Sequence, residues 1–174
     1  MMTLVIGGSG SGKSGYAESL LDGYAEKYYV ATMLAEDEEA RKKIGRHRAL
    51  RAGKGFVTIE QPRNLAEVVK SLVKEGVVLL ECVSNLVANE MFMPSGIVPE
   101  EVVAHKVLDD ICTLSEVVEV LVVVSNNVFE DGICYDETTM AYLRALATVN
   151  TGIARMADGV TEVVVGIPIV VKEQ

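Results

Sequence analysis

The feature that most constrains this chain is an unbroken glycine-rich motif. Residues 3–14 read TLVIGGSGSGKS, so a short apolar, mostly β-branched run leads into a match to G-x-x-x-x-G-K-[ST] without a gap. Glycines let the backbone adopt positive φ and approach a ligand closely, and successive N–H groups then form a concavity that binds phosphate oxygens. A helix that starts near Lys13 adds its positive N-terminal end. The motif predicts a nucleoside triphosphate site; a plain flexible Gly/Ser turn is the alternative.

The polar residues of this motif have separate expected roles. Lys13 supplies a point charge to the terminal phosphates, and the Ser14 hydroxyl ligates Mg²⁺. A carboxylate is also needed near the metal, and VVLLE (77–81) is the strongest candidate because parallel sheets bind ligands at the carboxyl ends of their strands. Glu81 is expected to hold Mg²⁺ or to accept a proton from an attacking hydroxyl; a solvent-facing strand end is the alternative. The residues predicted to cradle the phosphates are Gly7, Gly8, Ser9, Gly10, Ser11, Gly12, Lys13 and Ser14.

Strand and helix patterns alternate along the rest of the chain. Apolar, β-branched runs predict strands at 3–6, 28–31, 56–60, 77–80, 120–124, 160–165 and 168–171. Helix-forming segments are predicted at 14–23, 35–52, 65–75 (with Asn64 as its cap), 86–93, 100–119 and 137–157. Residues 93–99 (MPSGIVP) read as a loop, and the last two strands flank a Gly-Ile turn typical of a hairpin. The alternation predicts one α/β domain over residues 1–174, with a mostly parallel sheet covered by helices on both faces.

Charge and cysteine usage limit the partners of this domain. The formal net charge is -9, whereas nucleic acid and anionic membranes both reward a basic face, so neither is expected as the main partner. Three widely spaced cysteines without a C-x-x-C pair predict reduced thiols in a cytoplasmic protein. No signal peptide is visible, and no apolar run is long enough to span a bilayer.

One basic stretch contrasts with this acidic background. Residues 41–51 (RKKIGRHRALR) contain seven Arg, Lys or His residues among eleven, with His47 in their midst. A solvated helix face is the usual meaning of such a run. The other interpretation is a polyphosphate clamp, in which a neutral imidazole attacks phosphorus while arginines neutralise the charge. His105, in EEVVAHKVL, is expected at a solvated or half-buried helix position.

The order of these motifs resembles the bifunctional adenosylcobinamide kinase/adenosylcobinamide-phosphate guanylyltransferase family of cobalamin biosynthesis. The likeness covers nearly the whole length. The segments that carry it are GGSGSGKS, YYVAT, EDEEARKKI ahead of His47, FVTIEQP, VLLECVSNLVANEMF, VVVSNNV and VNTGIARMADGVTEVVVGIPIVVK.

The resemblance implies a RecA-like P-loop fold, a trimer and two linked reactions. Such enzymes phosphorylate the aminopropanol hydroxyl of adenosylcobinamide with a nucleoside triphosphate (GTP or ATP, with Mg²⁺). They then transfer GMP from GTP onto adenosylcobinamide phosphate, through a guanylylated histidine whose place His47 occupies. The resemblance also places further residues at the nucleotide: Ala31, Thr32, Met33, Arg48, Ala49, Leu50, Arg51, Glu60 and Glu81.

The second half of the chain departs from the family's pattern. The family's TNE-V-G stands here as SNNVF, so Asn127 and Phe129 replace a carboxylate and a glycine. The G-x-V-P stretch reads GICYD (132–136), and in the helix segment 143–151 only the asparagine, Asn150, is kept. Loss of a carboxylate at a phosphoryl-transfer site typically costs ~10²–10⁴ in rate. Asp131 and Asp136 are candidates to replace it.

These departures leave rival interpretations beside the full bifunctional enzyme. One is a divergent member that binds GTP while its kinase step is weakened or lost. Another is a non-catalytic nucleotide-binding or regulatory module, and a third is a kinase for a different hydroxylated substrate. Substrate-dependent consumption of GTP separates the enzymes from the binding module.

Overall fold

The structure is a computed structural model that describes residues 1–35, 38–72, 76–129 and 132–173, without the side chains at positions 39, 40, 43, 47, 50 and 51. The described residues form a seven-stranded sheet in the order β3-β2-β4-β7-β1-β8-β9. Its strands are β1 (Met2–Gly7), β2 (Lys27–Ala31), β3 (Phe56–Glu60), β4 (Val77–Glu81), β7 (Val120–Asn126), β8 (Gly159–Val164) and β9 (Ile167–Lys172). All neighbouring pairs are parallel except β8 and β9, which form the closing hairpin.

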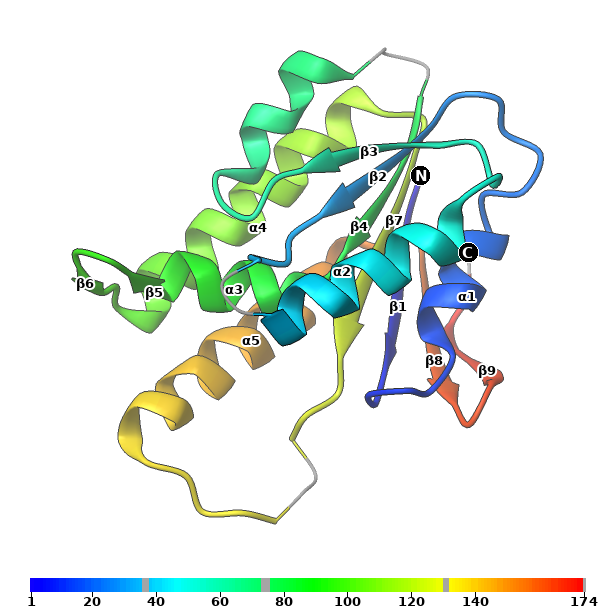
Figure 1. Cartoon of the computed structure of the whole chain (residues 1–174). Helices are drawn as coiled ribbons and strands as arrows, with labels where there is room; N and C mark the ends of the chain where they lie inside the picture. The colour runs from blue at the N-terminus through cyan, green and yellow to red at the C-terminus, as the bar shows by residue number, and fades with distance from the viewer. Residues whose placement is uncertain (36–37, 73–75, 130–131, 174) are drawn as a thin grey trace.

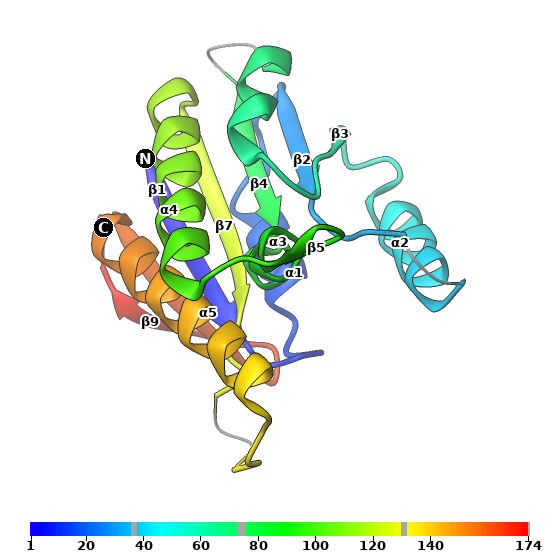
Figure 2. The ribbon, with the colours of Figure 1, turned by 90° about the vertical axis from the view of Figure 1, so that its left-hand side faces the viewer.

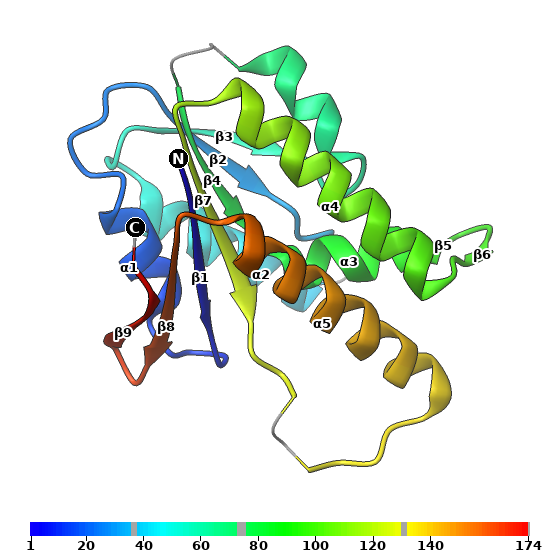
Figure 3. The same cartoon turned by 180° about the vertical axis from the view of Figure 1, so that it is seen from behind.

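Helices cover both faces of this sheet. They are α1 (Lys13–Ser19), α2 (Glu38–Arg51), α3 (Val83–Met91), α4 (Glu100–Val117) and α5 (Glu137–Met156), with a 3₁₀ helix η1 (Leu65–Ser71). Figure 3 shows α4 and α5 crossing one face, whereas Figure 1 shows α1 in front of the other. In Figure 2, α2 stands apart from the sheet, on the side opposite α4 and α5.

The central strands are apolar on both faces because both faces are buried. In β4, Val78 and Leu80 belong to the core under α3, α4 and α5, whereas Val77 and Leu79 belong to the smaller core under α1. This alternation follows from the two-residue period of a strand. Because β1, β7 and β4 are parallel, their carboxyl ends lie at one edge of the sheet. There Gly7 pairs with Asn126, and Glu81 pairs with Val124.

The predicted α/β architecture, mostly parallel sheet and terminal hairpin are confirmed, and several boundaries are wrong. The first helix ends at Ser19 rather than residue 23, and α3 begins at Val83 rather than residue 86. The segment predicted as a loop at 93–99 contributes to a short antiparallel pair, β5 (Phe92–Met93) with β6 (Gly96–Ile97). Residues 36–37 and 73–75, at the edges of two predicted helices, lie outside the described residues.

The prediction that Asn64 caps a helix at 65–75 is also wrong. The helix is a 3₁₀ turn that ends at Ser71, and Asn64 precedes it with φ 51° and no side-chain capping bond. An N-cap residue normally lies in the β-region, from which its side chain reaches the N–H groups of the first turn. Here the Asn64 N–H donates instead to Glu90 Oε1 at 2.6 Å, so tertiary contacts decide the local conformation.

Among the described residues, no helix combines the length and the apolar character that a membrane crossing requires.

Candidate functional site

The glycine-rich loop follows β1 at the carboxyl edge of the sheet (Figure 1). Gly7 lies in a crowded position, because an added Cβ would come within 2.5 Å of the Val163 carbonyl oxygen. Gly12 has φ 91° and immediately precedes α1, which begins at Lys13 as predicted. The turn of the β8–β9 hairpin supports the loop from outside, since the Gly166 N–H donates to the Ser11 carbonyl at 2.8 Å. The sequence between β1 and α1 is therefore held in a defined shape.

Ser14 and Glu81, predicted to share a metal, lie in direct contact. Ser14 Oγ donates to Glu81 Oε1 at 2.5 Å, although β7 separates the strands that lead to these two residues. Glu81 Oε2 is buried and has no hydrogen-bond partner among the described residues. A hydroxyl and an under-used carboxylate oxygen fit a hard cation such as Mg²⁺, which takes oxygen ligands and keeps several waters. The alternative of a solvent-facing Glu81 does not hold.

Lys13, the first residue of α1, extends its side chain against the glycine-rich loop. Its side chain is 8% exposed, and Nζ donates to the Gly8 carbonyl at 2.9 Å. This contact folds the lysine back over the concavity, where a bound phosphate would meet its ammonium group. Among the described residues, no group of three or more His, Cys, Asp or Glu is arranged to hold a metal ion.

A cavity of about 490 Å³ lies along the inner side of the loop, a volume in the range of small-molecule sites. The predicted residues that line it are Ser9 to Ser14, Ala31, Met33 and Glu81. The remaining lining residues were not predicted from the sequence; they are Tyr29, Ile44, Arg46, Cys82, Asn85, Asn126 and Val128. Most of these follow or end strands at the same edge, and the order of the strands in the sheet, which the sequence does not state, brings them to the cavity.

Two further features of the lining restrict its chemistry. Burial raises the pKa of the Cys82 thiol, against the opposing hydrogen bond with Ser84, so this cysteine stays protonated and is a poor nucleophile.

Hydrogen bonds also hold the carboxyl end of β7. Asn126 Nδ2 donates to Ser84 Oγ at 2.5 Å, and Ser125 Oγ donates to Asn150 Oδ1 at 2.6 Å. Asn150, the asparagine kept in the otherwise divergent helix segment, therefore fixes the polar end of β7.

Thr32 lies beneath the cavity rather than in its lining. It is fully buried, and its hydroxyl donates to the Cys82 carbonyl at 2.8 Å while accepting from the Cys82 N–H at 2.7 Å. The Thr32 N–H also donates to the Glu81 carbonyl at 3.0 Å. These three bonds fix the backbone on both sides of the Glu81–Cys82 peptide. Thr32 was predicted beside the nucleotide, and the structure places it where it orients Glu81.

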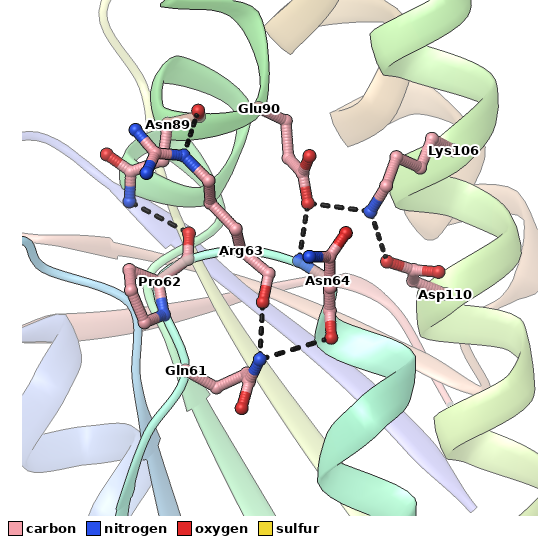
Figure 4. A network of polar contacts seen from close by, with 8 residues as sticks. All are labelled: Gln61, Pro62, Arg63, Asn64, Asn89, Glu90, Lys106 and Asp110. Carbon is pink, nitrogen blue, oxygen red and sulfur yellow. Dashed lines mark hydrogen bonds and ion pairs between the residues drawn. The ribbon is translucent and has the colours of Figure 1, made fainter. Parts of the chain in front are cut away.

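A polar network holds the segment after β3 against α3 (Figure 4). Asn89 Nδ2 donates to the carbonyl oxygens of Thr32 and Pro62, at 2.7 and 2.9 Å. Arg63 Nε donates to the Asn89 carbonyl at 2.7 Å. One asparagine thus joins the ends of β2 and β3, the two strands that border α2 in the sequence.

The same network continues to α4 through a buried acid (Figure 4). Glu90 is 6% exposed and accepts from Lys106 Nζ at 2.6 Å, and Lys106 also donates to Asp110 at 2.9 Å. Partial burial lowers the pKa of Lys106, but the bonds to Glu90 and Asp110 outweigh it and hold the pKa above its ordinary value. The buried carboxylate is therefore paired, as a charge in this position must be.

The basic helix α2 borders the cavity through Ile44 and Arg46. Arg48 forms an exposed ion pair with Glu60, which joins two residues predicted to share the site. Ala49 is exposed. The side chains of His47, Leu50 and Arg51 lie outside the described part of the structure. His105 is exposed on α4, as predicted.

Of the two aspartates considered as replacements for the missing carboxylate, Asp136 has a structural role. It caps α5, because its Oδ1 accepts from the N–H groups of Thr138 and Thr139 at 3.0 Å and its Oδ2 accepts from Thr139 Oγ1 at 2.7 Å. The hydroxyl and N–H bonds from Thr139 lower the pKa of Asp136. Asp131 lies outside the described residues.

Known proteins are similar to this chain over nearly its whole length. The family model "Cobinamide kinase / cobinamide phosphate guanyltransferase" matches residues 3–171. The bifunctional adenosylcobalamin biosynthesis protein CobU of Salmonella typhimurium is 32% identical over 99% of this chain and 100% of its own length. CobP of Pseudomonas aeruginosa, which carries the same description, is 29% identical over 99% and 98%. CobU of Escherichia coli is 38% identical, but its match spans only 55% of this chain and 53% of that protein.

A solved structure shares the fold. The P4 protein from bacteriophage phi6, in complex with ADP, matches with a TM-score of 0.51 and 18% identity, over 97% of this chain and 53% of that chain. This likeness confirms the P-loop NTPase fold expected from the glycine-rich motif, with its parallel sheet and flanking helices. At 18% identity, the likeness supports the fold and no statement about function.

Proposed function

The chain belongs to the cobinamide kinase / cobinamide phosphate guanyltransferase family, and from this premise we propose that it phosphorylates adenosylcobinamide with GTP or ATP and then transfers GMP from GTP onto the product. It is accordingly a phosphotransferase and nucleotidyltransferase. The observation that carries the proposal is the Ser14–Glu81 contact beside the glycine-rich loop, in a cavity that α2 also borders.

In the kinase step, the loop N–H groups and Lys13 hold the triphosphate. Lys13 Nζ exchanges its bond with the Gly8 carbonyl for oxygens of the terminal phosphates, because a charged acceptor binds an ammonium more strongly than a neutral one. Ser14 and Glu81 would hold Mg²⁺, which neutralises charge on the phosphate oxygens when it is bound. The substrate hydroxyl attacks the γ-phosphorus, the bond to the β–γ bridging oxygen breaks, and the nucleoside diphosphate leaves.

In the guanylyl transfer, we assign the nucleophile to His47. An imidazole nitrogen attacks the α-phosphorus of GTP, and pyrophosphate leaves with the electron pair of the broken bond. A phosphate oxygen of adenosylcobinamide phosphate then attacks the same phosphorus and releases the imidazole. Support comes from α2, which contributes Ile44 and Arg46 to the cavity and presents Arg48 on its surface, so cationic groups accompany the segment that carries His47.

The first experiment is intact mass spectrometry of the protein after incubation with Mg²⁺ and GTP, beside a His47→Asn variant. We expect a gain of one GMP in the wild type and none in the variant. The quench must avoid acid, because a phosphoramidate is acid-labile. A wild-type protein that binds GTP but gains no mass under such a quench contradicts the histidine intermediate. GTP- or ATP-dependent phosphorylation of cobinamide, measured separately, tests the kinase half and separates the full enzyme from the divergent and non-catalytic interpretations.

We further propose that the protein assembles as a homotrimer, as its resemblance to the family implies. The edge strand β9 favours self-association, because all six of its residues are exposed and most are apolar. An exposed apolar edge is normally avoided or covered in a soluble protein. Size-exclusion chromatography with light scattering measures the assembly, and a monomeric mass at micromolar concentration contradicts the proposal.

A further inference from the structure

A second hollow adjoins the first at the glycine-rich loop. Its volume is about 580 Å³, and it is lined by Gly8 to Ser11, by Asn127 and Val128 after β7, and by residues 162–165 of β8 and its turn. The two hollows share Ser9, Gly10, Ser11 and Val128. Among the described residues that line them, each hollow has one carboxylate, Glu81 in the first and Glu162 in the second.

These two carboxylates have different surroundings. Glu81 accepts from Ser14 and lies where a cation fits. Glu162 is half-buried near the carboxyl end of β8, on the strand that neighbours β1 on the opposite side from β7 and β4. Its Oε1 accepts from Asn127 Nδ2 at 3.3 Å, and the Asn127 N–H is itself bonded to the Gly7 carbonyl at 3.0 Å. Glu162 is therefore tied, through one asparagine, to the first residue of the glycine-rich loop.

Asn127 occupies the position at which the sequence departs from the family's carboxylate. The contact with Glu162 gives this departure a physical meaning. A carboxylate at both positions would place two negative charges within hydrogen-bond range, and such pairs resist full ionisation. An amide at 127 instead donates a hydrogen bond to Glu162 Oε1. The asparagine and the glutamate thus form a matched pair that keeps one carboxylate beside the loop.

We propose that Glu162 receives the proton of the acceptor hydroxyl in the kinase step, and that Asn127 is the positioning residue that orients it. This assignment rests on the proposed function. As the hydroxyl oxygen forms its bond to the γ-phosphorus, its proton passes to the Glu162 carboxylate, and the electron pair of the broken β–γ bridge leaves with the nucleoside diphosphate. The guanylyl transfer needs no such base, because its acceptor is already an ionised phosphate.

The test compares both half-reactions in four proteins. Glu162→Gln keeps the shape and the bond to Asn127 but removes the base, so we expect cobinamide phosphorylation to fall ~10²–10³-fold while the GMP adduct forms as in the wild type. The double variant Asn127→Glu/Glu162→Gln moves the carboxylate to its neighbour and is expected to recover at least ten-fold over Glu162→Gln. Glu119→Gln, an exposed position before β7, is the control and should match the wild type.

Each outcome decides between defined alternatives. Kinase activity of Glu162→Gln within about three-fold of the wild type overturns the assignment and leaves the proposed function intact. A loss in both half-reactions, or a loss that the double variant does not recover, shows a structural role and also overturns it. A wild-type protein that forms the GMP adduct but phosphorylates no cobinamide overturns the kinase half of the proposed function, and Glu162 with it.

Discussion

The glycine-rich loop and the basic helix α2 border the same cavity, but different kinds of contact hold them in place. In the loop region, Lys13 is buried, Ser14 contacts Glu81, and Gly7 has no room for a side chain. In α2, the described interactions are exposed ion pairs, Lys42 with Glu38 and Arg48 with Glu60. Buried contacts of the first kind fix a geometry, whereas exposed ion pairs contribute little.

This difference separates two demands of the proposed chemistry. A triphosphate cradle acts best when its donors are already aimed at the ligand, because preorganised groups need no reorganisation during the reaction. A helix that carries a transferable group must serve two substrates in turn, and weak surface contacts leave it free to be positioned by the nucleotide. We therefore expect substitutions in the loop to affect both reactions and substitutions in α2 to affect guanylyl transfer.

The sharpest test of this comparison is Lys13→Ala, for which we expect the largest effect. Loss of the ammonium group removes charge stabilisation from the phosphates in both reactions, so both rates should fall by about 10²–10³-fold. Steady-state assays of cobinamide phosphorylation and of GMP transfer measure the two effects side by side. The matched control is Lys70→Ala, an exposed lysine in η1, which should leave both rates unchanged. Loss of only one activity in Lys13→Ala would contradict a shared triphosphate site.

Glu81→Gln should have a smaller effect on the same region. The amide keeps an oxygen that accepts from Ser14 Oγ but removes the negative charge beside the metal position, and changes of this kind typically cost 10–100-fold in metal affinity or activity. The expected signature is a higher Mg²⁺ requirement in both reactions, measured by titrating Mg²⁺ at fixed GTP. Recovery of the rate at high Mg²⁺ supports a metal role; an equal loss at every Mg²⁺ concentration indicates proton transfer instead.

The sequence predicted the elements whose signal is local and missed those decided by tertiary contacts. The glycine-rich motif predicted the turn between β1 and α1, and the apolar run 77–81 predicted the strand that ends at Glu81, because each is encoded within a few consecutive residues. The short β5–β6 pair and the 3₁₀ helix were missed because they depend on packing. Asn64 has the residue type of a cap, but Glu90, 26 residues away, satisfies its N–H instead.

The sequence also did not show which residues of the site are neighbours in space. Asn127 was recognised as a departure, but its partner Glu162 lies 35 residues further along the chain and came next to it only through the strand order β7-β1-β8. Thr32 was placed beside the nucleotide by the resemblance to the family. Nothing in YYVAT indicates that its hydroxyl points to Cys82 instead.

Thr32→Val tests how much the buried hydrogen bonds of Thr32 with Cys82 contribute to stability. Valine matches the shape of threonine but leaves the Cys82 N–H and carbonyl without their partner in a buried site, which should lower the free energy of unfolding by about 2 kcal/mol. Urea denaturation followed by circular dichroism measures this change. Thr113→Val is the control, because the Thr113 hydroxyl bonds to Asp109 on the exposed face of α4. Equal changes in the free energy of unfolding of the two variants would contradict the role of Thr32 in holding the backbone next to Glu81.

Arg48→Ala addresses the other side of the comparison and should have the smallest effect on stability. Its ion pair with Glu60 is more than half exposed at both side chains, and exposed pairs contribute about 0–1 kcal/mol. We therefore expect a change in unfolding free energy below about 1 kcal/mol, which added salt diminishes further because it screens exposed charges. A double-mutant cycle with Glu60→Ala isolates the pair. A coupling above about 2 kcal/mol would mean that α2 is anchored as firmly as the glycine-rich loop, and the division between a fixed cradle and a movable helix would fail. A weak coupling, together with reduced GMP transfer and unchanged cobinamide phosphorylation in Arg48→Ala, places the contribution of this arginine in the guanylyl step.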